Sequence, residues 1–414
     1  MGNIESGVHT VMIEEHSFMD QYGYYQIGDL KTYSVYEVMD YYHKDPQPYT
    51  WMYNDEFFSQ YDWTQEPTES LDELYGARAK ELREQYDYIV LYYSGGYDST
   101  NMLRAFLDNG IYPDEICYFY SRHDTDSHQY YERINFTEKK LERLKQQYPK
   151  LKIRKLDYAD IVCNWPNTIA DQNLNMDPIY LQGGRLNVSR LALDVMYEYI
   201  DDWKQLLKDN KTLCTLHGVD HVQLRCAYDP DTKAISMFHN FNDLSVIGHL
   251  TPVRQMTNKP NRDTLEFFYW APTNTCAKIL IKQGQLTKQY FTKLTNGKLH
   301  RLFSSKYNNI VIKNYRHRKI SEAWFHLNTD HAFKQIIYPN IFKDGETFYN
   351  EKTDIAFWGN RDTWFFNTDL PGSKEHWAMY QSLYKEDKEH WKPFFNDQDM
   401  HQGPMKITSK DYTL

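Results

Sequence analysis

The segment from Ser94 to Thr100, with the sequence SGGYDST, combines residue types that bind phosphate groups. Its two adjacent glycines permit backbone angles and close approaches that a Cβ atom would prevent. Ser94, Ser99 and Thr100 place hydroxyls near the predicted start of a helix, where N–H groups and the helix dipole favour an anion. We therefore expect this segment to form an anion cradle, and phosphate is the anion that suits it best.

A strand and a helix are predicted on either side of this segment. The run from Tyr88 to Tyr93 is short, apolar and rich in β-branched and aromatic residues, as is typical of a central strand in a parallel sheet. Residues 99–110, STNMLRAFLDNG, predict a helix that ends at Gly110. The glycine turn thus connects the end of a buried strand to the start of a helix.

Further strands and helices alternate along the chain. Strands are predicted over 115–121, 151–161 and 212–216, and helices over 31–44, 70–86, 130–147 and 274–294. Ser70 and Glu73 form a capping box at the start of the second of these helices. This order predicts an α/β fold with a doubly wound parallel sheet, in which ligands bind at the carboxyl ends of the strands. Tyr120 and Ser121, at the end of the second core strand, are therefore expected near the same ligand.

A second glycine pair precedes another predicted helix, within residues 179–203. Gly183 and Gly184 allow a close backbone approach, and Arg185 is in a position to meet a phosphate. The alternative is that Arg185 is a surface residue at a helix start, and both readings stay open.

SGGYDST resembles the SGGxDS signature of the PP-loop ATP pyrophosphatases, and the resemblance covers about residues 86 to 290. It implies a sheet of the HUP/PP-loop type, and ATP and Mg²⁺ as the cofactors. These enzymes, which include asparagine synthetase and 7-cyano-7-deazaguanine synthase, split ATP into AMP and pyrophosphate. They adenylate a carbonyl or carboxylate oxygen, and ammonia, an amine or sulfur then displaces AMP. The stretch around Gly183, Gly184 and Arg185 resembles the YxPGRN segment of the latter enzyme, and these three residues correspond approximately to its Pro-Gly-Arg.

The resemblance also implies roles for individual residues. Asp98 and Asp220 would be the metal-binding carboxylates, and Asp98, Ser99 and Arg185 the catalytic residues. Asp220 could instead be an ordinary turn residue. The expected nucleotide-binding residues are Ser94, Gly95, Gly96, Tyr97, Asp98, Ser99, Thr100, Tyr120, Ser121, Gly183, Gly184, Arg185 and Gly218.

Residues that this chain lacks limit the range of reactions expected of it. It has neither the cysteine-rich zinc site of 7-cyano-7-deazaguanine synthase nor the paired cysteines of thiolating enzymes, and no nucleophilic cysteine precedes Cys117. We expect a ligase, amidating or nucleobase-modifying enzyme that acts on a small molecule, nucleobase or modified nucleotide, with ammonia free or supplied by a partner. A nucleotide-sensing protein without turnover, or a structural protein with a vestigial loop, are the alternatives.

Composition limits the environment and the partners. The net charge of −10 disfavours broad nucleic-acid binding, although a local basic groove is compatible with it. The five cysteines are scattered and contain no CxxC pair, as expected for free thiols in a reducing compartment. The sequence has no signal peptide pattern and no apolar run long enough for a membrane span. We therefore expect a cytoplasmic protein without a membrane partner.

Three regions are predicted: an aromatic-rich N-terminal extension (1–69), the PP-loop core (70–298) and an aromatic-rich C-terminal region (299–414). Basic and aromatic residues alternate in the last region, which could hold a nucleotide, but packing onto the core is the favoured interpretation. Lys278 and Lys282 share one face of the predicted 274–294 helix. Lysines in this region contact phosphates in several family members, but a solvated face is the expectation here.

Overall fold

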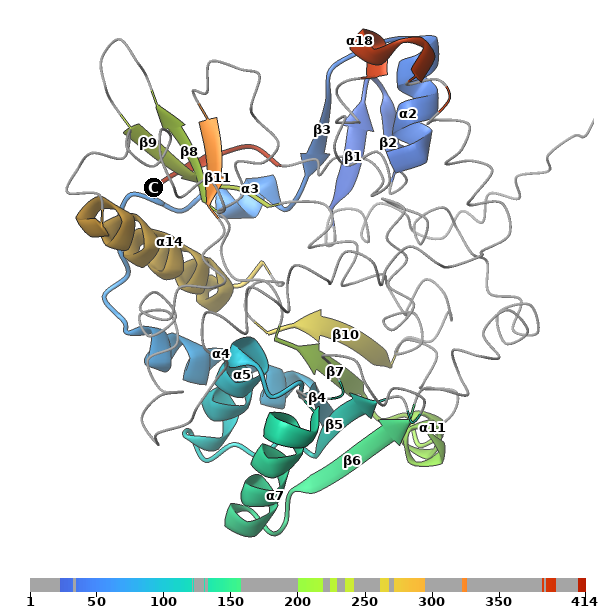
Figure 1. Ribbon diagram of the computed structural model, residues 1–414, viewed down its shortest axis with the longest axis vertical. Coiled ribbons are helices and arrows are strands. Elements are labelled where there is room, and N and C mark those ends of the chain that lie inside the picture. Colours follow the sequence, from blue (N-terminus) through green and yellow to red (C-terminus); the bar gives the residue numbers. More distant parts are fainter. Residues whose placement is uncertain are drawn as a thin grey trace, which may run out of the picture.

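The computed structural model of the 414-residue chain is shown in Figure 1. It describes residues 23–32, 35–120, 122, 130, 133–157, 200–218, 224–228, 235–241, 261–267, 272–294, 322–325, 382, 385–391 and 409–414.

The largest sheet among the described residues is parallel. Its five described strands are β4 (Tyr88–Tyr92), β5 (Glu115–Tyr120), β6 (Lys152–Asp157), β7 (Leu213–His217) and β10 (Arg262–Glu266). They are hydrogen-bonded in the order β10-β7-β4-β5-β6, and every neighbouring pair is parallel. The predicted α/β architecture with a parallel sheet is confirmed.

The strand order contains a reversal next to β4. The chain runs outward from β4 through β5 to β6, then returns to the opposite side of β4 with β7 and β10. In open α/β sheets such a reversal leaves a crevice outside the carboxyl ends of the two strands that flank it, and ligands bind there. Here those strands are β4 and β7.

Helices cover both faces of the sheet. Alternate residues of β4 point to opposite faces, and the residues on each face pack against different helices. Ile89 and Leu91 pack in a large core with α4 (Leu71–Gln85), α5 (Tyr97–Leu107), α7 (Glu138–Gln147) and α14 (Asn274–Leu294). Val90 and Tyr92 face the other way, into a smaller core around Trp203 of α11 (Asp201–Lys208). The sheet is therefore doubly wound, as predicted, and Figure 1 shows α11 apart from the other four helices.

The helix α14 has the predicted bounds, and α4 and α5 differ from the predicted helices by one to three residues at their ends. In α4, Ser70 accepts a hydrogen bond from the Glu73 N–H and Glu73 bonds back to the Ser70 N–H, so the capping box is confirmed. The helix predicted over 130–147 was wrong as one continuous α-helix, because a π-helical turn, η1 (Arg133–Thr137), precedes α7.

An antiparallel sheet lies in the N-terminal part of the chain. It consists of β1 (Tyr24–Ile27), β2 (Leu30–Thr32) and β3 (Tyr49–Met52), in the order β2-β1-β3. The helix predicted over 31–44 begins only at Val35, as α2 (Val35–Lys44), because the preceding residues pair with β1. A short helix, α3 (Asp55–Phe58), follows.

A second antiparallel sheet combines distant parts of the chain. Its order is β11 (Glu322–Phe325), β8 (Leu224–Tyr228), β9 (Ile235–His239) and β12 (Tyr412–Thr413). Two strands come from the segment predicted as core and two from beyond residue 298. A short helix, α18 (Lys388–Trp391), lies beside α2 in Figure 1.

The two lysines of α14 differ in exposure: 40% of the Lys278 side chain is exposed, as expected for a solvated face, whereas Lys282 is mostly buried. Lys278 forms an ion pair with Glu69. Lys282 pairs with Glu66 at 2.5 Å and donates to the Pro67 carbonyl at 2.9 Å, and its side chain is only 13% exposed. Both lysines therefore hold the N-terminal segment against α14.

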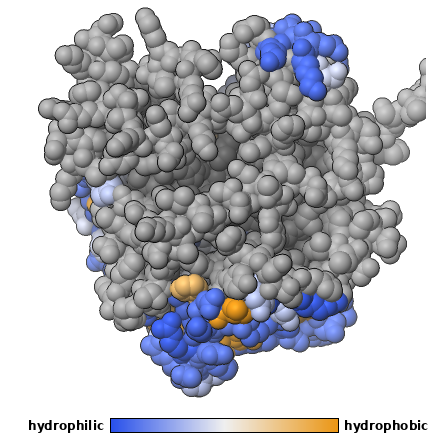
Figure 2. Space-filling view, viewed as in Figure 1, coloured by the Kyte–Doolittle hydropathy of each residue, from blue (hydrophilic) through white to orange (hydrophobic). Residues whose placement is uncertain are grey.

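The described surface seen in Figure 2 is mostly hydrophilic. Among the helices of the described residues, none has the length and apolar character needed to cross a membrane.

Candidate anion-binding site

The glycine turn lies at the carboxyl end of β4, as predicted. Strand pairing continues one residue past β4, because the Tyr93 N–H donates to the Cys117 carbonyl at 2.9 Å. Gly95 then adopts a φ of +82°, and a Cβ at this position would lie 2.8 Å from the Thr137 Oγ1. Glycine is therefore required here by backbone conformation and by space.

The hydroxyls of the turn differ in their exposure. Ser94 is exposed, and its Oγ lies 3.1 Å from the Oγ of buried Ser99 and accepts from the Gly96 N–H at 3.3 Å. Thr100 is also buried, with its Oγ1 3.3 Å from the Tyr93 hydroxyl. The described contacts thus brace the turn from inside through Ser99 and Thr100, while Ser94 remains at the surface.

The turn leads directly into α5, whose N-cap is Gly96. Gly96 makes no side-chain cap, and the Thr100 N–H donates to its carbonyl at 3.0 Å to close the first turn. Tyr97 and Asp98 lie in this first turn, where the helix dipole is positive. Asp98 is half-buried there.

Gly218 follows β7 and packs against this first turn. A Cβ at Gly218 would lie 2.8 Å from the Asp98 carbonyl oxygen and 3.1 Å from the Ser99 nitrogen. The structure therefore brings together two segments that are 120 positions apart in the sequence and that were both predicted as nucleotide-binding. They meet at the strand-order reversal between β4 and β7.

Two residues that sequence reasoning missed hold the turn from the side of α7. The Thr137 hydroxyl donates to the Ser94 carbonyl at 2.7 Å, and the Lys140 ammonium donates to the Gly95 carbonyl at 3.0 Å. Lys140 is only 4% exposed, so its positive charge is held close to the turn inside the protein. The sequence offered no local signal for either residue, because Lys140 lies in a run of charged residues and reaches the turn only through the fold.

Tyr75 of α4 adds a neutral hydroxyl near the same region. It is buried and accepts a hydrogen bond from the Gln283 amide at 2.8 Å. Burial raises the pKa of Tyr75 far above its usual value, and the carboxylates of Asp72 and Asp98 add to the increase. The Tyr75 phenol therefore stays protonated at physiological pH.

The end of β5 presents aromatic rings and a guanidinium. Arg133 lies over the rings of Tyr120, at 5.1 Å, and Tyr130, at 4.9 Å. Tyr118 and Tyr120 have nearly parallel rings with centroids 6.2 Å apart. Tyr118 is buried and the Arg133 guanidinium lies over the Tyr120 ring, so these groups pack against one another at the carboxyl end of β5.

Several predicted residues lie outside the described residues: Ser121, Gly183, Gly184, Arg185 and Asp220. Of the pair expected to bind a metal ion, Asp98 and Asp220, only Asp98 lies among the described residues. Within the described ranges, no group of three or more His, Cys, Asp or Glu residues is arranged to hold a metal ion.

The arrangement offers backbone N–H groups of a helix start, an exposed hydroxyl and a buried ammonium around one turn. These groups favour an anion. No protein-family model matches the chain, and no curated protein is significantly similar to it.

Proposed function

We propose that this chain is an ATP-dependent adenylating enzyme with a fold of the HUP/PP-loop type, which converts ATP into AMP and pyrophosphate. The observation that carries the proposal is the SGGYDST turn at the carboxyl end of β4, beside the strand-order reversal with β7. The contact between Gly218 and the first turn of α5 supports the same site.

The charge distribution around the turn supports phosphate as the ligand. The N-terminus of α5 carries the positive end of the helix dipole, and the Lys140 ammonium lies behind the Gly95 carbonyl. The exposed Ser94 hydroxyl can donate to a phosphate oxygen. In the proposed complex these groups bind the β and γ phosphates, and Arg185 contacts the nucleotide from the second glycine pair.

The donor chemistry fits Mg²⁺, since carboxylate and hydroxyl oxygens are hard ligands and magnesium in such sites takes few protein ligands. Asp98 would hold the ion, together with Asp220. When bound, magnesium would neutralise the charge of the pyrophosphate leaving group.

The proposed reaction is in-line displacement at the α-phosphorus. A carbonyl or carboxylate oxygen of the acceptor attacks, pyrophosphate leaves, and ammonia or an amine then displaces AMP from the adenylate. No side chain is required as a covalent nucleophile, so the protein acts through positioning and electrostatics. The acceptor is a small molecule or nucleobase, and ammonia arrives free or from a partner protein, in the cytoplasm.

The test is to separate the products of ATP turnover by the purified chain with magnesium, with candidate carboxylate and amide acceptors. AMP and pyrophosphate are the expected products. ADP and phosphate would refute the proposal, and ATP binding without any turnover across the acceptor panel would favour a nucleotide sensor.

Asp98→Asn is the test variant, and Asp201→Asn is its matched control. Both residues lie in the first turn of a helix, but Asp201 starts α11 on the opposite face of the sheet. Asp98→Asn should reduce AMP formation by at least a hundredfold, because the carboxylate that would hold magnesium is lost, and Asp201→Asn should leave it unchanged. Equal turnover in the two variants would exclude the assigned site.

A further inference from the structure

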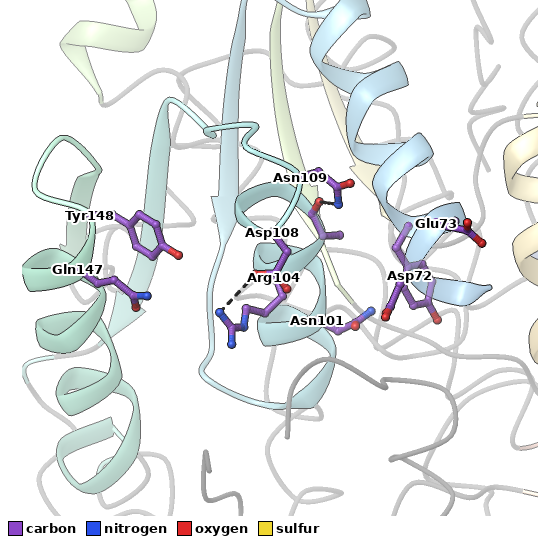
Figure 3. A pocket seen from close by; sticks show the side chains of 10 residues that line it. Asp72, Glu73, Asn101, Arg104, Asp108, Asn109, Gln147 and Tyr148 are labelled. Atoms are coloured by element: carbon purple, nitrogen blue, oxygen red, sulfur yellow. Dashed lines mark hydrogen bonds and ion pairs between the residues drawn. The ribbon is translucent and has the colours of Figure 1, made fainter. Parts of the chain in front are cut away.

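The helix α7 runs beside α5, and both helices begin at the glycine turn. At their far ends Gln147 and Tyr148, from the end of α7, line one pocket with Arg104 and Asp108, from the end of α5 (Figure 3). At their near ends, side chains from the start of α7 bind the turn from which α5 continues. The start of α7 therefore faces the backbone of the turn.

Two side chains at the start of α7 bind two successive carbonyls of the turn. Thr137 is the last residue of the π-helical turn η1, and such turns are rare and often lie at functional sites. Its buried hydroxyl donates to the Ser94 carbonyl at 2.7 Å. Lys140, also buried, donates to the Gly95 carbonyl at 3.0 Å. Both carbonyls therefore point toward α7.

The direction of these carbonyls fixes the direction of two N–H groups. A trans peptide is planar, and its C=O and N–H point in opposite directions. The Ser94–Gly95 and Gly95–Gly96 peptides are trans, so the N–H groups of Gly95 and Gly96 point away from α7. Gly95 makes this possible because its φ is +82°. Successive N–H groups that point the same way form a small concavity that binds anions.

The Ser94 side chain shows which side these N–H groups face. The Gly96 N–H donates to the Ser94 Oγ at 3.3 Å, and Ser94 is exposed. A phosphate oxygen is a stronger acceptor than a neutral hydroxyl, so it can replace the Ser94 Oγ as the partner of this N–H. The released hydroxyl can then donate to the same anion. The concavity thus opens toward the exposed side of the turn.

We propose that Thr137 and Lys140 are positioning residues, which hold the Gly95 and Gly96 N–H groups in the orientation that binds a diphosphate group. The Lys140 ammonium also polarises the Gly95–Gly96 peptide, which makes its N–H a stronger donor. Both residues act through the backbone of the turn and not by contact with the ligand. The inference rests on the proposed function, and it adds the residues that prepare the turn before the nucleotide binds.

The probe is inorganic pyrophosphate with magnesium, and its binding to the full chain is measured by isothermal titration calorimetry. Thr137→Val keeps the shape of the side chain, whereas Thr137→Ser keeps the hydroxyl. Thr137→Val should bind pyrophosphate about tenfold more weakly than the wild type, and Thr137→Ser within about threefold of it. Neither substitution changes the charge. A role in stability alone would lower the melting temperature of Thr137→Val and leave the affinity of the folded protein unchanged.

Lys140→Met is compared with Lys145→Met, which removes the same charge from the same helix. Lys145 donates to the carbonyls of Pro149 and Leu151, at the end of α7 that lies away from the turn. Lys140→Met should bind pyrophosphate at least about tenfold more weakly, because the Gly95 carbonyl loses its donor. Lys145→Met should bind it as the wild type does.

Equal affinity of Thr137→Val and Thr137→Ser would overturn the proposal, whatever the result for Lys140→Met, and so would a wild type that does not bind pyrophosphate. Circular dichroism checks folding, and Thr137→Ala takes the place of Thr137→Val if the latter is unfolded. The products of ATP turnover test the proposed function separately. If ADP forms while the two Thr137 variants differ in pyrophosphate affinity, the positioning role stands and the adenylating function fails.

Discussion

Acidification should destabilise this protein through one buried histidine, His239 of β9. The imidazole is 3% exposed and lies nearly parallel to the Trp63 indole, with an angle of 11° and ring centroids 5.1 Å apart. Its edge-on neighbour is Phe241, at 4.8 Å. Neither ring nitrogen makes a hydrogen bond with the described residues, and burial lowers the pKa of His239 from 6.5 to about 3.

The sign and size of the effect follow from linkage between protonation and folding. Above pH 6.5 the imidazole is neutral in both states and contributes no pH dependence. Below it the unfolded chain takes up a proton that the folded chain excludes, so the free energy of unfolding falls until about pH 3. At pH 5 the loss from this one residue is about 2 kcal/mol relative to pH 8.

The assay is urea unfolding of the wild type and of His239→Phe, each at pH 8 and at pH 5. Phenylalanine keeps an aromatic ring beside Trp63 but cannot be protonated. The decrease in unfolding free energy between the two pH values should be about 2 kcal/mol smaller in this variant, because all other histidines contribute equally to both proteins.

His43→Phe is the control, since His43 is exposed on α2. It should show the wild-type decrease. If His239→Phe lost as much stability as the wild type between pH 8 and pH 5, the reasoning from burial would be refuted.

Two further predictions concern the sheet. Gly218→Ala should lower the free energy of unfolding by about 1–3 kcal/mol, because the new methyl group would lie too close to the Asp98 carbonyl oxygen. Urea unfolding measures the change. Unchanged stability would contradict the close packing of Gly218, after β7, against the first turn of α5. Glu115→Gln should cost about 3–5 kcal/mol, because this fully buried carboxylate pairs with Arg154 and with Lys152, at 3.0 Å. Thermal unfolding measures that loss, and a melting temperature within a degree of the wild type would exclude a structural role for these pairs.

The local structure around β4 and the start of α4 could be predicted from the sequence. The β4–turn–α5 unit is contiguous, and its apolar run, glycine pair and helix pattern each point to the same structure. The Ser70–Glu73 capping box was equally accessible, because both residues lie within one helical turn.

Features that depend on contacts between residues far apart in the sequence could not be predicted. β10 has the polar sequence RDTLE and becomes a parallel strand only by pairing with β7, so no alternation or apolar run marks it. Lys140 and Lys282 look alike in sequence as charged helix residues. One holds the Gly95 carbonyl and the other holds Glu66 and Pro67, and both roles follow from tertiary packing.

The position of α14 has a consequence for dividing this chain into parts. Lys282 is held by residues 66 and 67, the Gln285 amide donates to the Trp63 carbonyl at 2.6 Å, and the helix also packs on α4, where the Gln283 amide donates to the Tyr75 hydroxyl. A fragment that started at residue 70 would leave a shielded ammonium without its carboxylate and a buried amide without its acceptor. The segment before α4 is therefore part of the folding unit that contains the glycine turn, and its removal should also impair the site at that turn.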